Sequence, residues 1–273
     1  MTALRLLLCI GAASLLQAQS SRWNVIWSDE FNAPAKSAPD PAKWTYDLGG
    51  GGWGNRELEV YTNGIDNVFQ DGQGHLVIQA LKTDAGFTSG RIKTQGKFDF
   101  QYGRIEARIR IPFGQGIWPA FWMLGSDIPS IGWPDCGEID VMENIGKEPT
   151  TVHATVHGPG YSGSGGISGK LESSSGQRFT DDFHVFGMVW EPNSIQFFAD
   201  GALYQRVTPA DLPNGTKWVY DHPFFLLLNV AVGGSWPGNP DQTSRFPQAM
   251  LVDWVRVSKL AEPAVRTRLP HHR

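Results

Sequence analysis

Apolar and polar residues alternate in several segments of the chain, and this period of two is typical of strands with one buried and one solvated face. Residues 104–111, Arg-Ile-Glu-Ala-Arg-Ile-Arg-Ile, show it most clearly. We expect this segment to form a hairpin with residues 96–100. Further strands are expected at residues 23–27, 75–82, 120–124, 138–143, 151–157, 184–190, 195–199, 224–232 and 250–257.

Turn-forming residues separate these expected strands, and the chain contains 32 Gly and 18 Pro. Strands and helices do not alternate in the pattern, which argues against a parallel α/β sheet. We therefore predict an all-β fold, a β-jelly-roll sandwich of two antiparallel sheets. Residues 158–176 are rich in Gly and Ser, and we expect a mobile surface loop there.

The two ends of the chain have their own composition. Arg5 precedes an apolar run, Leu6 to Leu16, which is too short to span a membrane comfortably and is typical of a secretory signal. We expect residues 1–18 to be removed, with a retained membrane anchor as the alternative. The protein is then secreted or periplasmic, with one β-domain over residues 21–260 and a disordered basic tail at 261–273.

The composition of the chain limits the classes of binding partner and the chemistry of its cysteines. The net charge of −4 argues against nucleic acid, and the eleven Trp residues favour a stacking surface for flat rings. Of the two cysteines, Cys9 lies in the predicted signal, so the mature chain has no internal disulfide. Cys136 has acidic neighbours that raise a thiol pKa, so we expect a buried structural residue. Nothing in the sequence requires more than a monomer without membrane contact.

Residues 137–144, Gly-Glu-Ile-Asp-Val-Met-Glu-Asn, hold three carboxylates within six positions. Glu138 and Asp140 project to one face of a strand, whereas Glu143 is one position out of phase. A β-bulge supplies one extra residue and restores the phase. We therefore predict a bulge at Val141–Met142 that turns all three acids to one face.

Paired carboxylates flanking a scissile bond are the working groups of most glycosidases. Glu138 and Glu143 would lie about four strand steps apart, roughly 13 Å between Cα atoms, and their long side chains can lean inward. This favours a retaining mechanism, with Glu138 as nucleophile, Glu143 as acid and base, and Asp140 orienting Glu138. The alternatives are a solvated acidic strand and a calcium site, although the latter normally adds loop carbonyl ligands.

The motif Glu-Ile-Asp-Val-Met-Glu at 138–143 resembles the active-site signature of family 16 glycoside hydrolases, and its six-residue form resembles that of laminarinases. The resemblance extends from about residue 23 to residue 257. It implies a jelly roll with a substrate cleft on the concave face and retaining endo-hydrolysis of β-1,3-glucan, with no cofactor for catalysis. Other segments that resemble the family are residues 53–57, 102–108, 116–124, 229–238 and 246–253.

The resemblance also implies substrate-binding residues. Sugar rings have apolar faces that stack on aromatic side chains, and a few polar groups fix their hydroxyls. Taken alone, each of these residues is more often part of a core or an ordinary strand. The positions that match are the indoles Trp118, Trp122, Trp133 and Trp236, and the hydroxyl-binding residues Asn55, Arg91 and His157.

The family often has a structural calcium ion on the convex side, and the matching ligands are Glu30, the Gly74 carbonyl and Asp253. Ordinary turn acids are the alternative. One departure lies near the cleft: Glu59 stands where Gln is common in the family, which puts the preference for mixed-linkage chains in doubt.

Other functions remain open at this point. Within the enzymes, the rivals are a mixed-linkage β-1,3-1,4-glucanase, a red-algal galactanase and a transglycosylase. From a different class, the fold also serves non-catalytic glucan-binding recognition modules, which tend to lack the acids that this chain has at Glu138 and Glu143.

Overall fold

Strand β8 (Gly103–Arg110) shows how the alternating pattern becomes structure. Ile105, Ala107 and Ile109 are buried, while the charged residues between them face outward. The predicted strand is therefore confirmed, with the buried face that its period of two requires.

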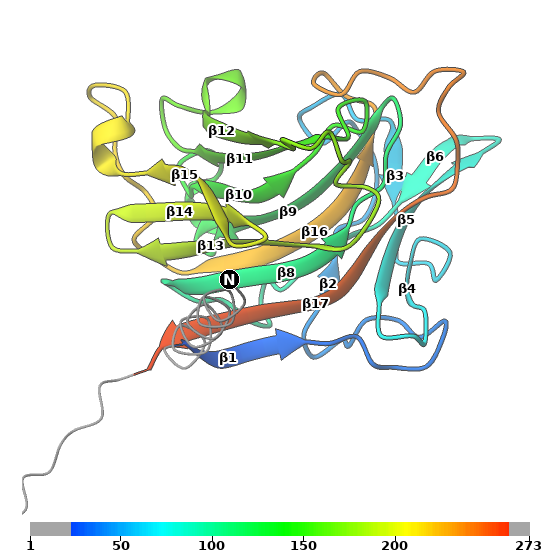
Figure 1. The fold of residues 1–273 in the computed structure, drawn as a ribbon, viewed down its shortest axis with the longest axis horizontal. Coiled ribbons are helices and arrows are strands. Elements are labelled where there is room, and N and C mark those ends of the chain that lie inside the picture. The colour runs from blue at the N-terminus through cyan, green and yellow to red at the C-terminus, as the bar shows by residue number, and fades with distance from the viewer. Residues whose placement is uncertain (1–22, 262–273) are drawn as a thin grey trace, which may run out of the picture.

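The computed structural model describes residues 23–261, and these form two curved, stacked β-sheets (Figure 1). The predicted all-β sandwich is confirmed, while the predicted signal at 1–18 and the tail beyond Ala261 lie outside the described residues. The first sheet contains β1 (Trp23–Asp29), β3 (Glu59–Tyr61), β4 (Val68–Gln70), β5 (Leu76–Thr83), β6 (Gly86–Ser89), β8, β13 (His184–Glu191), β14 (Ser194–Ala199), β15 (Ala202–Val207) and β17 (Gln248–Leu260).

The second sheet carries the candidate site and has the order β12-β11-β10-β9-β16-β7-β2. Its strands are antiparallel throughout. They are β2 (Thr45–Tyr46), β7 (Arg91–Lys93), β9 (Ile117–Gly125), β10 (Glu138–Glu143), β11 (Thr151–His157), β12 (Ile167–Glu172) and β16 (Phe224–Val232). The short helices are α2 (Ile128–Ile131), η1 (Gly163–Gly165) and η2 (Pro209–Asp211).

The second sheet is apolar on both faces. Phe121 and Leu228 belong to the main core between the sheets. The adjacent residues in the same strands, Trp122 and Leu227, belong to a separate apolar cluster on the opposite face. All nine residues of β16 are buried, so this strand forms both a wall of the core and the floor of the concave face.

The predicted hairpin between residues 96–100 and β8 is wrong. Residues 94–98 form a turn, in which the amides of Lys97 and Phe98 donate to the Thr94 carbonyl. Phe98 and Phe100 pack against the core from this turn, and Phe100 makes only an isolated bridge to β16. The alternation of this segment arose from two aromatic anchors rather than from a strand, and β8 pairs with β13 and β17 instead.

The predicted loop at residues 158–176 is also wrong in part, because it contains strand β12. This strand pairs with β11 along its whole length, and its side chains alternate between half-buried and exposed. It lies at the edge of its sheet, where small and polar residues are tolerated, so its Gly- and Ser-rich sequence concealed it.

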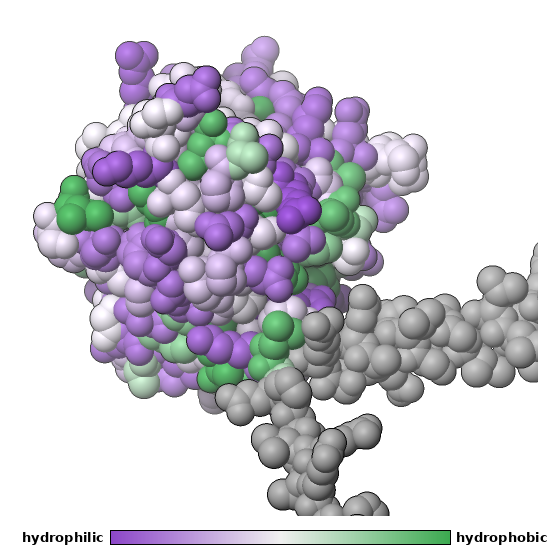
Figure 2. Space-filling view, turned by 90° about the vertical axis from the view of Figure 1, so that its left-hand side faces the viewer, coloured by the Kyte–Doolittle hydropathy of each residue, from purple (hydrophilic) through white to green (hydrophobic). Residues whose placement is uncertain are grey.

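The visible surface is mixed. Apolar side chains form separate small groups among hydrophilic ones on the face in Figure 2. Within residues 23–261, no helix is long and apolar enough to cross a membrane.

The alternation of β8 gives a stability prediction. Ile105→Ala should lower the free energy of unfolding by about 2–5 kcal/mol, because it leaves a cavity in a fully buried site. Arg110→Ala on the outer face of the same strand is the control, with an expected change within about 1 kcal/mol. Urea denaturation of both variants measures the difference, and equal losses would contradict the assigned faces.

Candidate active site

Strand β10 contains the predicted bulge, which lies between Asp140 and Glu143. Its neighbour β9 runs without interruption, so β9 shows which side chains share a face. The three acids lie opposite alternate residues of β9: Glu138 opposite Leu124, Asp140 opposite Trp122, and Glu143 opposite Ala120. Met142 lies opposite Phe121 and is buried in the main core with it. The prediction that the acids share one face is confirmed.

The register also gives the spacing of the two outer acids. Their partners on β9 are four residues apart, which corresponds to roughly 13 Å between the Cα atoms of Glu138 and Glu143. The acids therefore line one row across the concave face, and their carboxyl groups can approach each other only through their side chains.

Two indoles hold the outer acids. The Nε1 group of Trp133 donates to Oε2 of Glu138 at 2.6 Å, and that of Trp118 donates to Oε1 of Glu143 at 3.0 Å. Both Trp residues were predicted to line the cleft. Each indole leaves its ring available for an apolar contact while its N–H fixes a carboxyl group.

His157 on β11 lies beside the inner acid. Its Nε2 atom is 3.2 Å from Oδ2 of Asp140 and 3.9 Å from Oε1 of Glu138. These three side chains place ligand-type atoms within 4.8 Å of one another, the one such group of three or more among residues 23–261. Since the same carboxyls are the candidate catalytic groups, we assign them no metal.

Burial changes the protonation of the acids. Desolvation, followed by the charge of Asp140, raises the pKa of Glu138 to about 8 and raises that of Glu143 well above its usual value. Desolvation also raises the pKa of Asp140 to about 7. The Trp133 hydrogen bond and His157 partly oppose the shift at Glu138. Three clustered carboxyls cannot all ionise readily, and Glu143 is therefore suited to hold a proton.

Arg91 is held flat on the concave face. Its guanidinium carbon lies 4.7 Å from the ring centres of both Trp53 and Trp122, and its Nε donates to Asp47 at 2.9 Å. The indole of Trp122 donates in turn to Oδ1 of Asn229 at 2.7 Å. The sequence indicated Arg91 and Trp122, but not the partners that hold them, because Asp47 and Asn229 are distant in the chain.

A cavity of about 310 Å³ adjoins this stack. Its lining combines an apolar floor with charged and polar groups at the rim, a composition typical of ligand clefts. The lining residues are Asp47, Trp53, Arg91, Lys93, Gln95, Leu124, Ile128, Pro129, Phe225 and Leu227.

The other predicted binding residues also lie at this face. Trp236 packs edge-on against Trp118, with 5.4 Å between ring centroids, and against His153 at 5.0 Å. Its side chain is 38 % exposed and that of Trp133 is 48 % exposed, which suits stacking on a sugar. Asn55 donates from Nδ2 to Oε1 of Glu57 at 3.0 Å.

Cys136 belongs to the apolar cluster on the same face as the acids and is fully buried. Desolvation, with smaller contributions from Asp127 and Glu138, raises the pKa of its thiol to about 12. The prediction of a structural rather than nucleophilic cysteine is consistent with this, because the thiolate is the reactive form.

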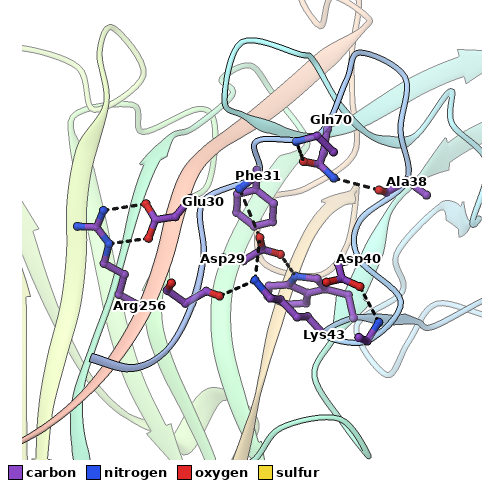
Figure 3. A network of polar contacts seen from close by, with 12 residues as sticks. Asp29, Glu30, Phe31, Ala38, Asp40, Lys43, Gln70 and Arg256 are labelled. Carbon is purple, nitrogen blue, oxygen red and sulfur yellow. Dashed lines mark hydrogen bonds and ion pairs between the residues drawn. The ribbon is translucent and has the colours of Figure 1, made fainter. Parts of the chain in front are cut away.

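The predicted calcium ligands lie at the first sheet: Glu30 follows β1 and pairs with Arg256 (Figure 3), Gly74 precedes β5, and Asp253 lies on β17. Arg256 makes two hydrogen bonds to Glu30, at 2.9 and 2.8 Å, and Nη1 of Arg108 donates to Asp253 at 2.6 Å. Both carboxylates are thus paired with arginines, which would compete with a calcium ion for their oxygens. The calcium site stays a prediction outside the mechanism.

Comparison with known proteins agrees with this geometry. Residues 55–256 match the model of glycosyl hydrolases family 16. A beta-glucanase from Rhodothermus marinus is 40 % identical over 96 % of this chain and 95 % of its own. The endo-beta-1,3-glucanase structure from Pyrococcus furiosus is 49 % identical, covers 88 % of this chain and 95 % of its own, and has a TM-score of 0.82.

The laminarinase catalytic domain from Thermotoga maritima MSB8 is 46 % identical, covers 87 % of this chain and 98 % of its own, and has a TM-score of 0.81. The chain belongs to glycoside hydrolase family 16. The resemblance seen in the sequence is therefore confirmed, and the protein is a glycoside hydrolase.

The charge of Asp140 gives a testable pH dependence. It raises the pKa of both Glu138 and Glu143, so Asp140→Asn should lower both. The acid limb of kcat/KM, where Glu138 must ionise, and the alkaline limb, where Glu143 must stay protonated, should both move to lower pH. Rate profiles on a soluble β-glucan measure this. Asp181→Asn, in an exposed ion pair with Arg178, is the control and should leave both limbs in place.

Calcium binding is tested by thermal melting. If the predicted site forms, calcium chloride should raise the melting temperature relative to EGTA, because an ion that binds only the folded state stabilises it by mass action. Asp253→Asn should remove the difference. Identical melting curves for the unaltered protein would contradict the site.

Proposed function

We propose that the protein is a secreted, retaining endo-glycosidase that hydrolyses laminarin-like β-1,3-glucan by double displacement. The observation that carries the proposal is the bulged strand β10, which turns Glu138, Asp140 and Glu143 to one face of an indole-lined sheet. The relatives named as endo-β-1,3-glucanase and laminarinase support the same substrate.

In the first step, the carboxylate of Glu138 attacks the anomeric carbon and forms a covalent glycosyl-enzyme. The proton of Glu143 passes to the glycosidic oxygen, so the leaving sugar departs as a neutral alcohol. The raised pKa of Glu143 supports this role, because the group can hold its proton near neutral pH.

In the second step, the ionised Glu143 accepts a proton from a water molecule, whose oxygen attacks the anomeric carbon. The bond to Glu138 breaks, and its carboxylate is regenerated. Two inversions give net retention. Asp140 and His157 lie beside Glu138 and orient it, and the reaction as proposed needs no cofactor.

The concave face supports a polysaccharide substrate. Trp118, Trp133 and Trp236 offer indole faces for sugar rings, while Asn55 and Arg91 are placed at the same face to bind hydroxyl groups. Trp122 and His157 complete this set. Cleavage within a glucan chain requires an open cleft. The exposed rings of Trp133 and Trp236 are consistent with such a cleft.

The six-residue form of the motif favours β-1,3-glucan over the rival substrates. A mixed-linkage β-1,3-1,4-glucanase is the main alternative. It is disfavoured because the unbulged five-residue motif that marks lichenase-type enzymes is absent here. A binding module on the same fold is disfavoured by the buried, hydrogen-bonded acids.

The nucleophile assignment is tested by Glu138→Gln. Hydrolysis of laminarin should fall by on the order of 10³-fold or more, while laminarin binding measured by calorimetry is retained, because the indole surface is unchanged. Glu172→Gln on edge strand β12 is the control and should keep full turnover. Unchanged hydrolysis by Glu138→Gln would exclude its role.

The substrate and stereochemistry are tested with the unaltered protein. A time course on laminarin should release a range of oligosaccharides whose new reducing ends are first β by NMR. Barley β-glucan and agarose distinguish the rivals. Cleavage of agarose with laminarin untouched would overturn the proposed function.

A further inference from the structure

The cleft wall formed by residues 55–59 is attached to the loop that follows β16. The amide of Leu58 donates to the Val232 carbonyl at 2.8 Å, and the amide of Ser235 donates to the Asn55 carbonyl at 2.8 Å. Next to the first of these bonds, the amide of Val232 donates to Oε2 of Glu59 at 2.6 Å. The Glu59 side chain thus takes the place of a backbone carbonyl at the end of β16.

Glu59 is 1 % exposed, and it is a buried carboxyl that the proposed mechanism does not use. Its Oε1 atom is buried and accepts no hydrogen bond from any described residue. The carboxyl group of Glu57 is the neighbour that acts most strongly on the charge of Glu59. A buried carboxylate oxygen without a donor is costly, whereas a protonated Glu59 can use that oxygen to donate to the Glu57 carboxylate.

Glu57 is hydrogen-bonded to residues of the concave face. Its Oε1 atom accepts from Asn55, and its Oε2 atom accepts from the Tyr61 hydroxyl at 3.2 Å. That hydroxyl accepts from Nδ2 of Asn229 at 3.0 Å, and Asn229 also holds the indole of Trp122. Hydrogen bonds therefore connect Glu57 to Asn55 directly, and to Trp122 through Tyr61 and Asn229.

We propose that Glu59 is a positioning residue, which carries a proton and donates it in a hydrogen bond to Glu57, so that Asn55 and Trp122 are held in place for the glucan. The inference rests on the proposed function for its kinetic readout. Glu59 touches no substrate itself and acts through Glu57. A glutamine at this position keeps one donor and one acceptor, and it can make both hydrogen bonds without a proton from solvent.

The surroundings favour the neutral form. Desolvation, followed by the hydrogen bond and charge of Glu57, raises the pKa of Glu59 from 4.5 to about 8. The Tyr61 phenol lies next to both carboxyls, and the Arg91 guanidinium on β7 acts on that phenol. On the neighbouring strand β6, Glu59 lies opposite Phe87, which does not ionise. Above about pH 8, two adjacent carboxylates repel each other and weaken this wall.

Linkage fixes the sign of the stability effect. A carboxyl with a raised pKa in the folded state contributes stability that is complete below about pH 4.5 and is lost as the pH rises through about 8. Glu59→Gln removes this loss. Its melting temperature should therefore exceed that of the unaltered protein at neutral and alkaline pH, and the gap should close below about pH 4.5. This measurement does not depend on activity.

The kinetic test compares Glu59→Gln with Glu59→Leu on laminarin. Glu59→Leu loses both hydrogen bonds, so KM should rise about tenfold with kcat within about twofold. Glu59→Gln should keep the KM and kcat of the unaltered protein at neutral pH. Above about pH 8, KM should rise for the unaltered protein and stay flat for Glu59→Gln.

The outcomes separate the two proposals. If the unaltered protein leaves laminarin intact, the proposed function fails, and the melting comparison still tests the protonated pair. If laminarin is cleaved but Glu59→Leu keeps its KM, or Glu59→Gln is as impaired as Glu59→Leu, the positioning role is excluded. A melting gap that is independent of pH would exclude the shared proton.

Discussion

The active site depends on a geometric constraint: a strand presents every second residue, and β10 presents acids at intervals of two and three. The bulge between Asp140 and Glu143 absorbs the odd residue. Without it, Met142 would occupy the row of the acids and Glu143 would point into the core. Because Met142 instead packs with Phe121 in the main core, hydrophobic burial holds the bulge in place.

The same sheet must carry charge on a surface that is mostly apolar. Two buried carboxyls and a partly buried one are costly to ionise, and the structure offsets this cost locally, with an indole donor for each outer acid and an imidazole for the inner one. The residual cost appears as raised pKa values, which acid catalysis at Glu143 can use. Burial, which makes a carboxyl group costly to ionise, here favours the protonated form of Glu143 that acid catalysis requires.

The sequence predicted the site better than it predicted some of its surroundings. The acids and their common face follow from a period of two and one inserted residue within a short segment, so a local pattern was sufficient, whereas the indoles were indicated by the family resemblance. The partners of Arg91 could not be predicted in this way, because Asp47 and Trp53 reach it through tertiary contacts with no shared pattern. Strand β12 was missed because an edge strand needs little hydrophobicity, and residues 96–100 were misjudged because aromatic anchors in a turn imitate alternation.

The order of the strands has a consequence for how the protein assembles. The central strand β9 pairs with β16, and β8 pairs with β17, the last strand of the described chain, which also holds the first strand, β1. Each sheet thus closes only when segments from opposite ends of the sequence meet. Such non-local pairing is associated with slow folding, because loop-closure entropy is lost before the contacts form. During synthesis, β9 stays without its partner β16 until late, and the incomplete sheet of the nascent chain is vulnerable to aggregation.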